Sequence, residues 1–327
     1  MKIKVLKFGG TSVGSIEAIK RSADIIHDWS KKSKVIAVLS AMSGETDRLI
    51  NLTKSFSKNP NPIDFDNAIS SGENVSCALM SICLNNQKIK AKSLLSWQIP
   101  IITSSEHMKS RILSINKKFL YDELENFDVL LIPGFQGINN KGELTTLGRG
   151  GSDTSAVAVA AAMETECIIY TDVEGVFTTD PNIVPKAKKI NKISYEEMLE
   201  LASQGAKVLQ TRSVELAMRK NTKLSVRSSF KPKKIGTMIT DEKSVLENNT
   251  VSGITYSKDE AKITLSRVQD KPGVSSKIFG PLAKGNINVD MILQNISQDG
   301  KFANLSFTLP RLDLSLIHIS EPTRHES

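Results

Sequence analysis

Short apolar runs alternate along the chain with segments whose apolar residues recur every three or four positions. Residues 2–8 alternate polar and apolar side chains and predict a first strand, and residues 34–39 predict a second. Between them, helical spacing is kept by Ile16, Ile19, Ala23 and Ile26. Strands and helices that alternate with short loops are typical of a mostly parallel sheet covered on both faces by helices.

The same alternation continues to about residue 240. Ser71, Gly72 and Glu73 open a helix in which Val75, Leu79 and Ile82 share one face. Residues 134–144 predict a hairpin that turns at residues 139–142. Further strands are expected near 90–95, 128–132, 167–170 and 224–228, and further helices near 194–203 and 206–220.

A second, smaller domain follows a polar segment. Residues 241–250 predict a linker between a domain at 1–240 and a smaller unit at 251–313. The smaller unit has an unfinished β-α-β-β pattern, with strands at 263–268, 287–292 and 302–309 and a helix at 275–284. Residues 314–327 do not continue this pattern, and we interpret them as a non-native tail.

The most informative stretch runs from residue 145 to residue 163. Gly148, Gly150 and Gly151 surround Arg149, and the Ala and Val residues that follow form a helix with no polar face. Such a helix is expected to be buried, with its positive N-terminal end directed into a cleft. The stretch therefore predicts an anion site; the alternative is an ordinary strand–turn–helix junction.

Composition narrows the classes of function. With 327 residues and 39% hydrophobic content, the chain can bury a core, and it has no apolar run long enough to span a membrane and no signal peptide. The three cysteines, Cys77, Cys83 and Cys167, are expected to be buried free thiols in the cytoplasm. The net charge of +8 suits anionic substrates, whereas 5% aromatic residues provide no stacking platform for nucleic acid.

Glycines near a lysine suggest phosphate binding, but not of the common kinds. Gly9 and Gly14 have the spacing of a P-loop, yet Ser15 stands where that motif requires lysine, and no dinucleotide fingerprint follows the first strand. Lys7 instead precedes the glycines at the end of a strand, which fixes its charge at the sheet edge where ligands bind. The alternative is a surface lysine, as expected for Lys2 and Lys4.

These motifs together resemble the aspartokinase family of the amino acid kinase superfamily. The resemblance covers about residues 1–310, and KFGGTSV and TTLGRGGSDT are its most specific parts. It implies the amino acid kinase fold, similar to carbamate kinase, followed by a truncated ferredoxin-like ACT module without the second ACT module of the family. The segments that carry it are residues 7–13, 40–46, 71–74, 134–137, 145–154, 171–181, 225–228, the turn 270–273 and residues 286–295.

The resemblance implies transfer of a phosphoryl group from ATP, with Mg²⁺, to the β-carboxylate of L-aspartate. This is the first step of lysine, threonine and methionine biosynthesis, with feedback by lysine or threonine. A carboxylate is already ionised at neutral pH and needs no general base, so catalysis must come from positioning and from cations and amides. His27 and His107 lie outside the motifs, in agreement with such chemistry.

By the same resemblance, Lys7 and Asp153 are the catalytic pair, although Asp153 could instead be a plain helix N-cap. No residue is assigned to a metal. Substrate binding is expected from Ser40, Thr46, Glu73, Arg149, Gly150, Gly151 and Ser152. ATP binding is expected from Lys7, Phe8, Gly9, Gly10, Thr171, Asp172, Gly175, Val176, Asp180, Pro181, Lys207 and Val208. Effector binding is expected from Asp270, Gly273, Val274, Asn288, Asp290, Gln294 and Asn295.

Other functions stay open on the sequence. The same fold could phosphorylate acetylglutamate, glutamate, carbamate or UMP, although the TTLGRGGSDT loop and the ACT-like unit favour aspartate. The chain could also be a non-catalytic amino-acid sensor, or part of a bifunctional kinase–dehydrogenase. We expect a homo-oligomer formed through the ACT region, with no nucleic-acid or membrane partner.

Overall fold

The computed structural model divides the chain into two compact units, Met1–Thr255 and Tyr256–Ser327, each described by itself. The described residues are 1–148, 150–206, 208–241, 253–256, 259–269, 271–285, 287, 289, 291–296 and 302–314. The expected linker at 241–250 lies outside them except for Asp241, and so does the expected tail except for Leu314.

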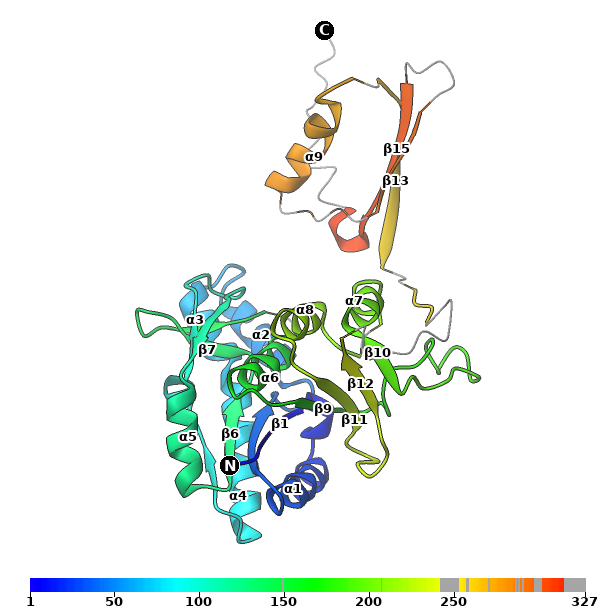
Figure 1. Ribbon diagram of the computed structural model, residues 1–327. Coiled ribbons are helices and arrows are strands. Elements are labelled where there is room, and N and C mark those ends of the chain that lie inside the picture. The colour runs from blue at the N-terminus through cyan, green and yellow to red at the C-terminus, as the bar shows by residue number, and fades with distance from the viewer. Residues whose placement is uncertain are drawn as a thin grey trace. The chain divides into compact units, whose positions relative to one another are not determined.

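An eight-stranded sheet forms the centre of the first unit (Figure 1). Neighbouring strands are parallel except for one antiparallel pair, β11 with β12, so the predicted mostly parallel sheet is confirmed. In spatial order the strands are β10 (Lys192–Ser194), β12 (Thr237–Thr240), β11 (Leu224–Ser228), β9 (Cys167–Thr171), β1 (Ile3–Phe8), β2 (Lys34–Leu39), β6 (Val129–Pro133) and β3 (Ala91–Ser93).

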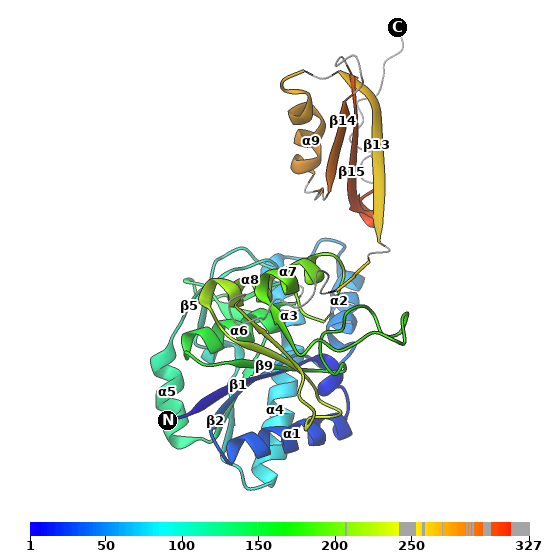
Figure 2. The same cartoon turned by 45° about the vertical axis from the view of Figure 1, so that its right-hand side comes forward.

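Helices cover both faces of this sheet (Figure 2). Successive side chains of a strand point to opposite faces, so Val5 packs in one core and Leu6 in the other. The core with Leu6 is closed by α1 (Ile16–Ser30) and α4 (Ser71–Asn86). The core with Val5 is closed by α5 (Lys117–Asn126), α6 (Gly151–Ala162), α7 (Tyr195–Ser203) and α8 (Thr211–Lys220).

The helix rich in alanine and valine is buried, as its sequence predicts. Residues 151 to 160 of α6 are all buried, and the helix packs between the sheet and α8. By contrast, Val75, Leu79 and Ile82 of α4 share one face as predicted, but that face is exposed. The opposite face of α4, with Cys77, Met80 and Leu84, forms the core contact.

A small second sheet adjoins the main one. Its strands are β5 (Ile112–Ile115), β4 (Ile101–Thr103), β7 (Gln136–Ile138) and β8 (Leu144–Thr146). The predicted hairpin is confirmed by the antiparallel pair of β7 and β8, which turns through Gly142 at φ +78°. The connecting segments contain α2 (Glu45–Phe56), α3 (Pro62–Ile69) and the 3₁₀ turns η1 (Gly10–Ser12) and η2 (Ser96–Gln98).

One predicted helix start is wrong. The helix expected from residue 206 begins at Thr211, because Gly205 adopts φ +109° at the end of α7 and Gln210 is still extended. Ala206 does not continue the helix, and its amide donates to the carbonyl of Leu201. Helical spacing alone does not show such a break.

The second unit has the predicted β-α-β-β order. Its sheet has the antiparallel strand order β13 (Glu260–Gln269), β15 (Phe302–Pro310) and β14 (Ile292–Ile296), with α9 (Val274–Lys284) against it and a 3₁₀ turn, η4 (Arg311–Asp313), at its end. The strand predicted at 287–292 is misplaced, because it begins only at Ile292. Ile287 instead packs under α9, where its amide donates to the carbonyl of Leu282.

Two general sequence predictions concern cysteines and membranes. All three cysteines are free; Cys77 and Cys167 are buried and Cys83 is half-buried. Burial raises the pKa of the Cys77 and Cys167 thiols, so both stay protonated at neutral pH. Within the described part of the chain, no helix is both long and apolar enough to cross a bilayer.

Tight packing of α6 leads to a first prediction. Ala156 is fully buried, whereas Ala162 at the other end of α6 is half-buried. Ala156→Leu should lower the free energy of unfolding by about 1–3 kcal/mol, because a packed interior cannot absorb the added volume. Urea denaturation measures this, with Ala162→Leu as the control, and equal losses in the two variants would contradict the packing described.

Candidate active site

Lys7 and Asp153 form a nearly buried ion pair at the edge of the main sheet. Lys7 lies near the end of β1, between Val38 of β2 and Ile169 of β9 in register. Its Nζ lies 2.6 Å from Oδ1 of Asp153, and each side chain is only about a tenth exposed, 11% and 10%. The structure thus brings together the two residues assigned to catalysis, from segments 146 positions apart in sequence (153 − 7).

Gly9 leaves the space that this ammonium occupies. A Cβ at residue 9 would lie 3.3 Å from Nζ of Lys7. The Gly9 amide donates to the carbonyl of Tyr170, which ties the glycine-rich turn to β9. Phe8, directly before this turn, is fully buried and stacks on Tyr170. The turn is therefore held on rigid strands, close to the charged amine.

The first turn of α6 faces the same edge. Gly150, at φ +72°, is its N-cap residue, so Asp153 stands in the first turn and is not the cap. Gly134 lies so close that a Cβ there would meet Ser152 at 2.8 Å, and the Phe135 amide donates to Ser155 Oγ at 3.2 Å. Free amides at a helix N-terminus attract anions. Arg149, assigned to the substrate carboxylate, lies outside the described residues.

Glu73 is a buried carboxylic acid near this edge. Its side chain lies in the first turn of α4 and the residue is 3% exposed. Burial raises the pKa of Glu73 to about 8, although hydrogen bonds with the backbone of Ala41 and of Glu73 itself lower it. Its Oε2 has no hydrogen-bond partner among the described residues. A buried, unpaired carboxylate is costly, so its position favours a cationic ligand.

The loop that follows β2 connects these groups. Ser40 is half-buried, and its amide donates to the carbonyl of Phe8. The carbonyl of Ala41 would lie 3.1 Å from a Cβ at Gly10, and the Ala41 methyl 2.8 Å from one at Gly72. Glycine at both positions thus lets the first glycine turn and the start of α4 approach one loop. Thr46 follows that loop, in the first turn of α2, and is half-buried.

A second group of residues assigned to the nucleotide begins with Thr171, the last residue of β9, and continues in the segment after it. Thr171 donates through Oγ1 to Asp172, and its carbonyl accepts from the amide of Ser229, whose hydroxyl meets Ser12. This chain of contacts connects the segment after β9 to the glycine turn after β1.

Several of these nucleotide assignments have structural roles in the described chain. Val176 is 2% exposed in the core, and its amide donates to Thr237 Oγ1 at 2.8 Å. Gly175 has φ +151°, and Asp180 caps a turn by accepting from the Asn182 amide. Pro181 is exposed and Val208 half-buried, while Lys207 lies outside the described residues.

Comparison with known proteins identifies the family. Residues 2–228 match the amino acid kinase family, and residues 263–317 match the ACT domain. An aspartate kinase of Pseudomonas putida is 48% identical over 314 residues, 95% of this chain and 76% of that protein. This chain belongs to the aspartokinase family.

Solved aspartokinase structures agree with this assignment. Escherichia coli aspartokinase III in complex with aspartate and ADP matches with a TM-score of 0.76 at 26% identity, over 95% of this chain and 79% of that one. The same enzyme in complex with lysine and aspartate matches with a TM-score of 0.75 at 26% identity, over 94% and 79% of the two chains. The expected amino acid kinase fold and ACT module are therefore confirmed.

Sequence reasoning missed two supports of this aspartokinase site. The first is Asp66 of α3, fully buried, whose carboxylate accepts from Thr146 Oγ1 at 2.6 Å and from the amides of Thr146 and Met108 at 3.1 Å each. His107 Nδ1 lies 2.8 Å from the same carboxylate. These bonds fix the strand that leads directly into the glycine-rich loop at 148–151.

The second missed support is Arg212 of α8. Its guanidinium donates to the carbonyls of Leu147 and Ser110, at 2.8 Å each. Burial lowers the pKa of Arg212, and the nearby Arg111 lowers it further. Because Leu147 precedes the glycine loop, Arg212 and Asp66 hold its entry from two sides. Their partners are distant in sequence, so no local motif marks either residue.

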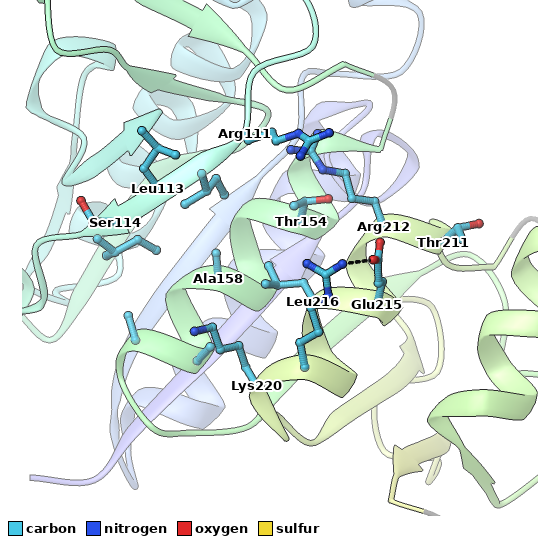
Figure 3. Close-up of a pocket in the computed structure, with 15 residues that line it drawn as sticks. Arg111, Leu113, Ser114, Thr154, Ala158, Thr211, Arg212, Glu215, Leu216 and Lys220 are labelled. Carbon is cyan, nitrogen blue, oxygen red and sulfur yellow. Dashed lines mark hydrogen bonds and ion pairs between the residues drawn. The ribbon is translucent and has the colours of Figure 1, made fainter. Parts of the chain in front are cut away.

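A cavity of about 700 Å³ lies along the outer flank of α6 (Figure 3). Residues of β5, α6 and α8 line it, among them Arg111, Ala158, Leu216 and Lys220. None of the residues assigned to aspartate or ATP lines this cavity, although Thr154, next to Asp153, does. The cavity therefore shares α6 with the site but none of the assigned residues.

In the ACT-like unit, the described part of the effector set falls into two places. Gly273, at φ +88°, is the N-cap residue of α9, and Val274 begins that helix. Gln294 and Asn295 are exposed on β14. Asp270, Asn288 and Asp290 lie outside the described residues, so this assignment stays a prediction.

The Asp66 network leads to a second prediction. Asp66→Asn should lower the free energy of unfolding by about 3–5 kcal/mol, because an amide nitrogen would face donors that now share a buried carboxylate. Asp64→Asn, in the same helix but exposed, should change it by less than about 1 kcal/mol. Urea unfolding of both variants tests this, and similar small losses would show that the Asp66 network is not a structural anchor.

Proposed function

We propose that this chain phosphorylates the β-carboxylate of L-aspartate with ATP. The observation that carries the proposal is the Lys7–Asp153 pair beside the α6 N-terminus, with the unpaired acid Glu73 in the same part of the fold. Family membership supports the choice of reaction, since relatives at this level of identity are aspartate kinases.

The chemistry requires electrostatics and positioning more than proton transfer. The attacking carboxylate is ionised at neutral pH, and both it and the phosphates are negative. Lys7 would approach the transferring phosphoryl group and stabilise the charge that its oxygens carry in the transition state. Asp153 would hold the ammonium in place, since the 2.6 Å contact leaves it little freedom.

Aspartate would be recognised at both of its ends. Glu73 would pair with the substrate ammonium, which would give Oε2 the partner that none of the described residues provides. Arg149 would pair with a carboxylate in two-pronged fashion, as only a guanidinium can. Ser40, Thr46, Gly150, Gly151 and Ser152 would complete the contacts through hydroxyls and amides.

ATP would lie against the glycine turn, with its base and ribose toward the segment after β9. The assigned residues are Lys7, Phe8, Gly9, Gly10, Thr171, Asp172, Gly175, Val176, Asp180, Pro181, Lys207 and Val208. No group of three or more His, Cys, Asp or Glu side chains that could hold a metal occurs among the described residues. A Mg²⁺ ion would be carried mainly by phosphate oxygens, where it would neutralise charge.

The ACT-like unit would make the enzyme responsive to lysine or threonine, through Asp270, Gly273, Val274, Asn288, Asp290, Gln294 and Asn295. The same unit would join copies of the chain, since β13 and β14 are the edge strands of its sheet among the described residues. We also propose a cytoplasmic location, because free cysteines are typical of proteins in a reducing compartment.

Replacing Lys7 tests the role of the strand-end cation. Lys7→Ala should lower kcat for ATP-dependent aspartyl phosphate formation, trapped as hydroxamate, by about 10²–10³-fold. Lys4→Ala, on the same strand but paired with Glu166, should leave kcat unchanged. Near-normal turnover of the Lys7 variant would remove Lys7 from the mechanism.

Proton release on aspartate binding tests the role of Glu73. With a pKa of about 8, Glu73 is mostly protonated at pH 7, and an ammonium beside it favours the ionised form. Binding should therefore release close to one proton at pH 7, and the aspartate KM should fall as pH rises from 6 to 8. Calorimetry in buffers of different ionisation enthalpy measures the proton count.

Two variants make this test specific. Glu73→Gln should abolish the proton release and raise the aspartate KM about tenfold or more. Glu17→Gln, in the first turn of α1 and exposed, should change neither. Proton release that persists in the Glu73 variant would assign the ammonium to another group.

A further inference from the structure

The cavity along α6 is strongly positive. Among the described residues, its lining contains one carboxylate, that of Glu215, and four cationic side chains, those of Arg111, Arg212, Arg219 and Lys220. The carboxylate is already paired with Arg219. The lining thus has a net charge of +3. A concave surface that carries charge of one sign concentrates small ions of the opposite sign.

Two of these cations lie close together without a counter-ion. The guanidinium groups of Arg111 and Arg212 meet at one end of the cavity, whereas Lys220 lies at the other end (Figure 3). Burial lowers the pKa of Arg212 and the charge of Arg111 lowers it further, an effect that Glu215 only partly offsets. Neither Arg111 nor Arg212 forms an ion pair with a described residue. An anion between the two guanidinium groups would replace their repulsion with attraction.

Both arginines have hydrogen-bond donors left for a ligand. A guanidinium carries five N–H donors. Arg212 directs Nη1 to the carbonyl of Leu147 and Nη2 to the carbonyl of Ser110, which leaves part of its donor set free. Arg111 is exposed, and none of the described residues accepts a hydrogen bond from its guanidinium. Carboxylates and phosphates match the fork of such a group, because two of their oxygens can accept in parallel.

Much of the remaining lining is apolar and built from small side chains. Ala158 is 7% exposed, and Ala161 and Ala162 are half-buried along the same flank of α6. Leu216 of α8 and Ile112 of β5 border this flank. A cavity of about 700 Å³ has the size of sites that hold small organic molecules, and an inorganic ion would fill little of it.

We propose that this cavity binds a small organic anion, with its carboxylate or phosphate between Arg111 and Arg212 and its apolar body against Ala158 and Leu216. None of the residues assigned to aspartate or ATP lines the cavity, so the ligand is a further one. Because Arg212 also bonds the carbonyl of Leu147, the ligand would contact the side chain that holds the entry of the glycine loop. Binding here does not depend on which reaction the chain catalyses.

Titration of the full chain with phenyl phosphate tests both parts of the ligand. Isothermal titration calorimetry should show saturable binding. Inorganic phosphate, which lacks the apolar body, and phenol, which lacks the charge, should each bind at least about tenfold more weakly. Benzoate in the same titration distinguishes the two head groups, and the tighter of benzoate and phenyl phosphate identifies the preferred one.

Three variants locate the binding. Arg111→Ala should raise the Kd of phenyl phosphate about tenfold or more, because the charged fork at the cavity mouth is lost. Lys109→Ala removes the same charge from an exposed position of the same segment that does not line the cavity, and should leave the Kd unchanged. Lys7→Ala should also leave it unchanged, which separates the cavity from the proposed active site. Arg212 is kept in all three because it holds Leu147.

A fourth variant tests the apolar body. Ala162→Leu fills part of the cavity and should weaken phenyl phosphate more than it weakens inorganic phosphate. If Arg111→Ala and Lys109→Ala give the same Kd, or if Lys7→Ala abolishes binding, the anion binds elsewhere and the proposal is overturned. Inorganic phosphate that binds as tightly as phenyl phosphate would reduce the cavity to a simple ion site and would overturn it too, as would the absence of any binding.

Discussion

The ion pair of Lys7 and Asp153 is the constraint on which the site depends. Holding a lysine ammonium at the sheet edge requires a nearby anion, and α6 provides it in its first turn. Removing two charges from water costs free energy that their attraction only partly returns, so such a pair does little for stability by itself. The ion pair instead fixes the position of one cation beside the amides of a glycine turn and of a helix N-terminus.

The remaining scaffold serves to keep these groups at one edge. Asp66 and Arg212 hold the chain that enters the glycine loop, and the serine contacts between residues 12 and 229 tie the first glycine turn to the segment after β9. Glu73 is the exception, a buried acid whose Oε2 has no hydrogen-bond partner in the part of the chain that the structure describes. Under the proposed function, substrate charges would satisfy this site, and binding would then be specific for an ammonium and a carboxylate together.

Much of this arrangement was predictable from local patterns, and the limits have physical causes. Leu224–Ser228 forms the strand expected from its residues, and the alanine-rich helix is buried because it has no polar face. The predicted start of α8 was wrong because Gly205 interrupts the helical spacing. The predicted position of β14 was wrong because Ile287 packs under α9 instead of joining the strand. Asp66 could not be found, since its donors lie 41 to 80 positions away. Periodicity also predicted an apolar face on α4, but it did not show that a second apolar face of the same helix packs on the core.

The most direct measurement is a double-mutant cycle on the pair. kcat/KM for aspartate is determined for Lys7→Ala, Asp153→Ala and the double variant. If Asp153 acts by holding Lys7, the double variant should be no slower than Lys7→Ala alone, because residues that work as a unit are strongly non-additive. Losses that multiply would contradict this, and would show that Asp153 contributes independently of the lysine it contacts.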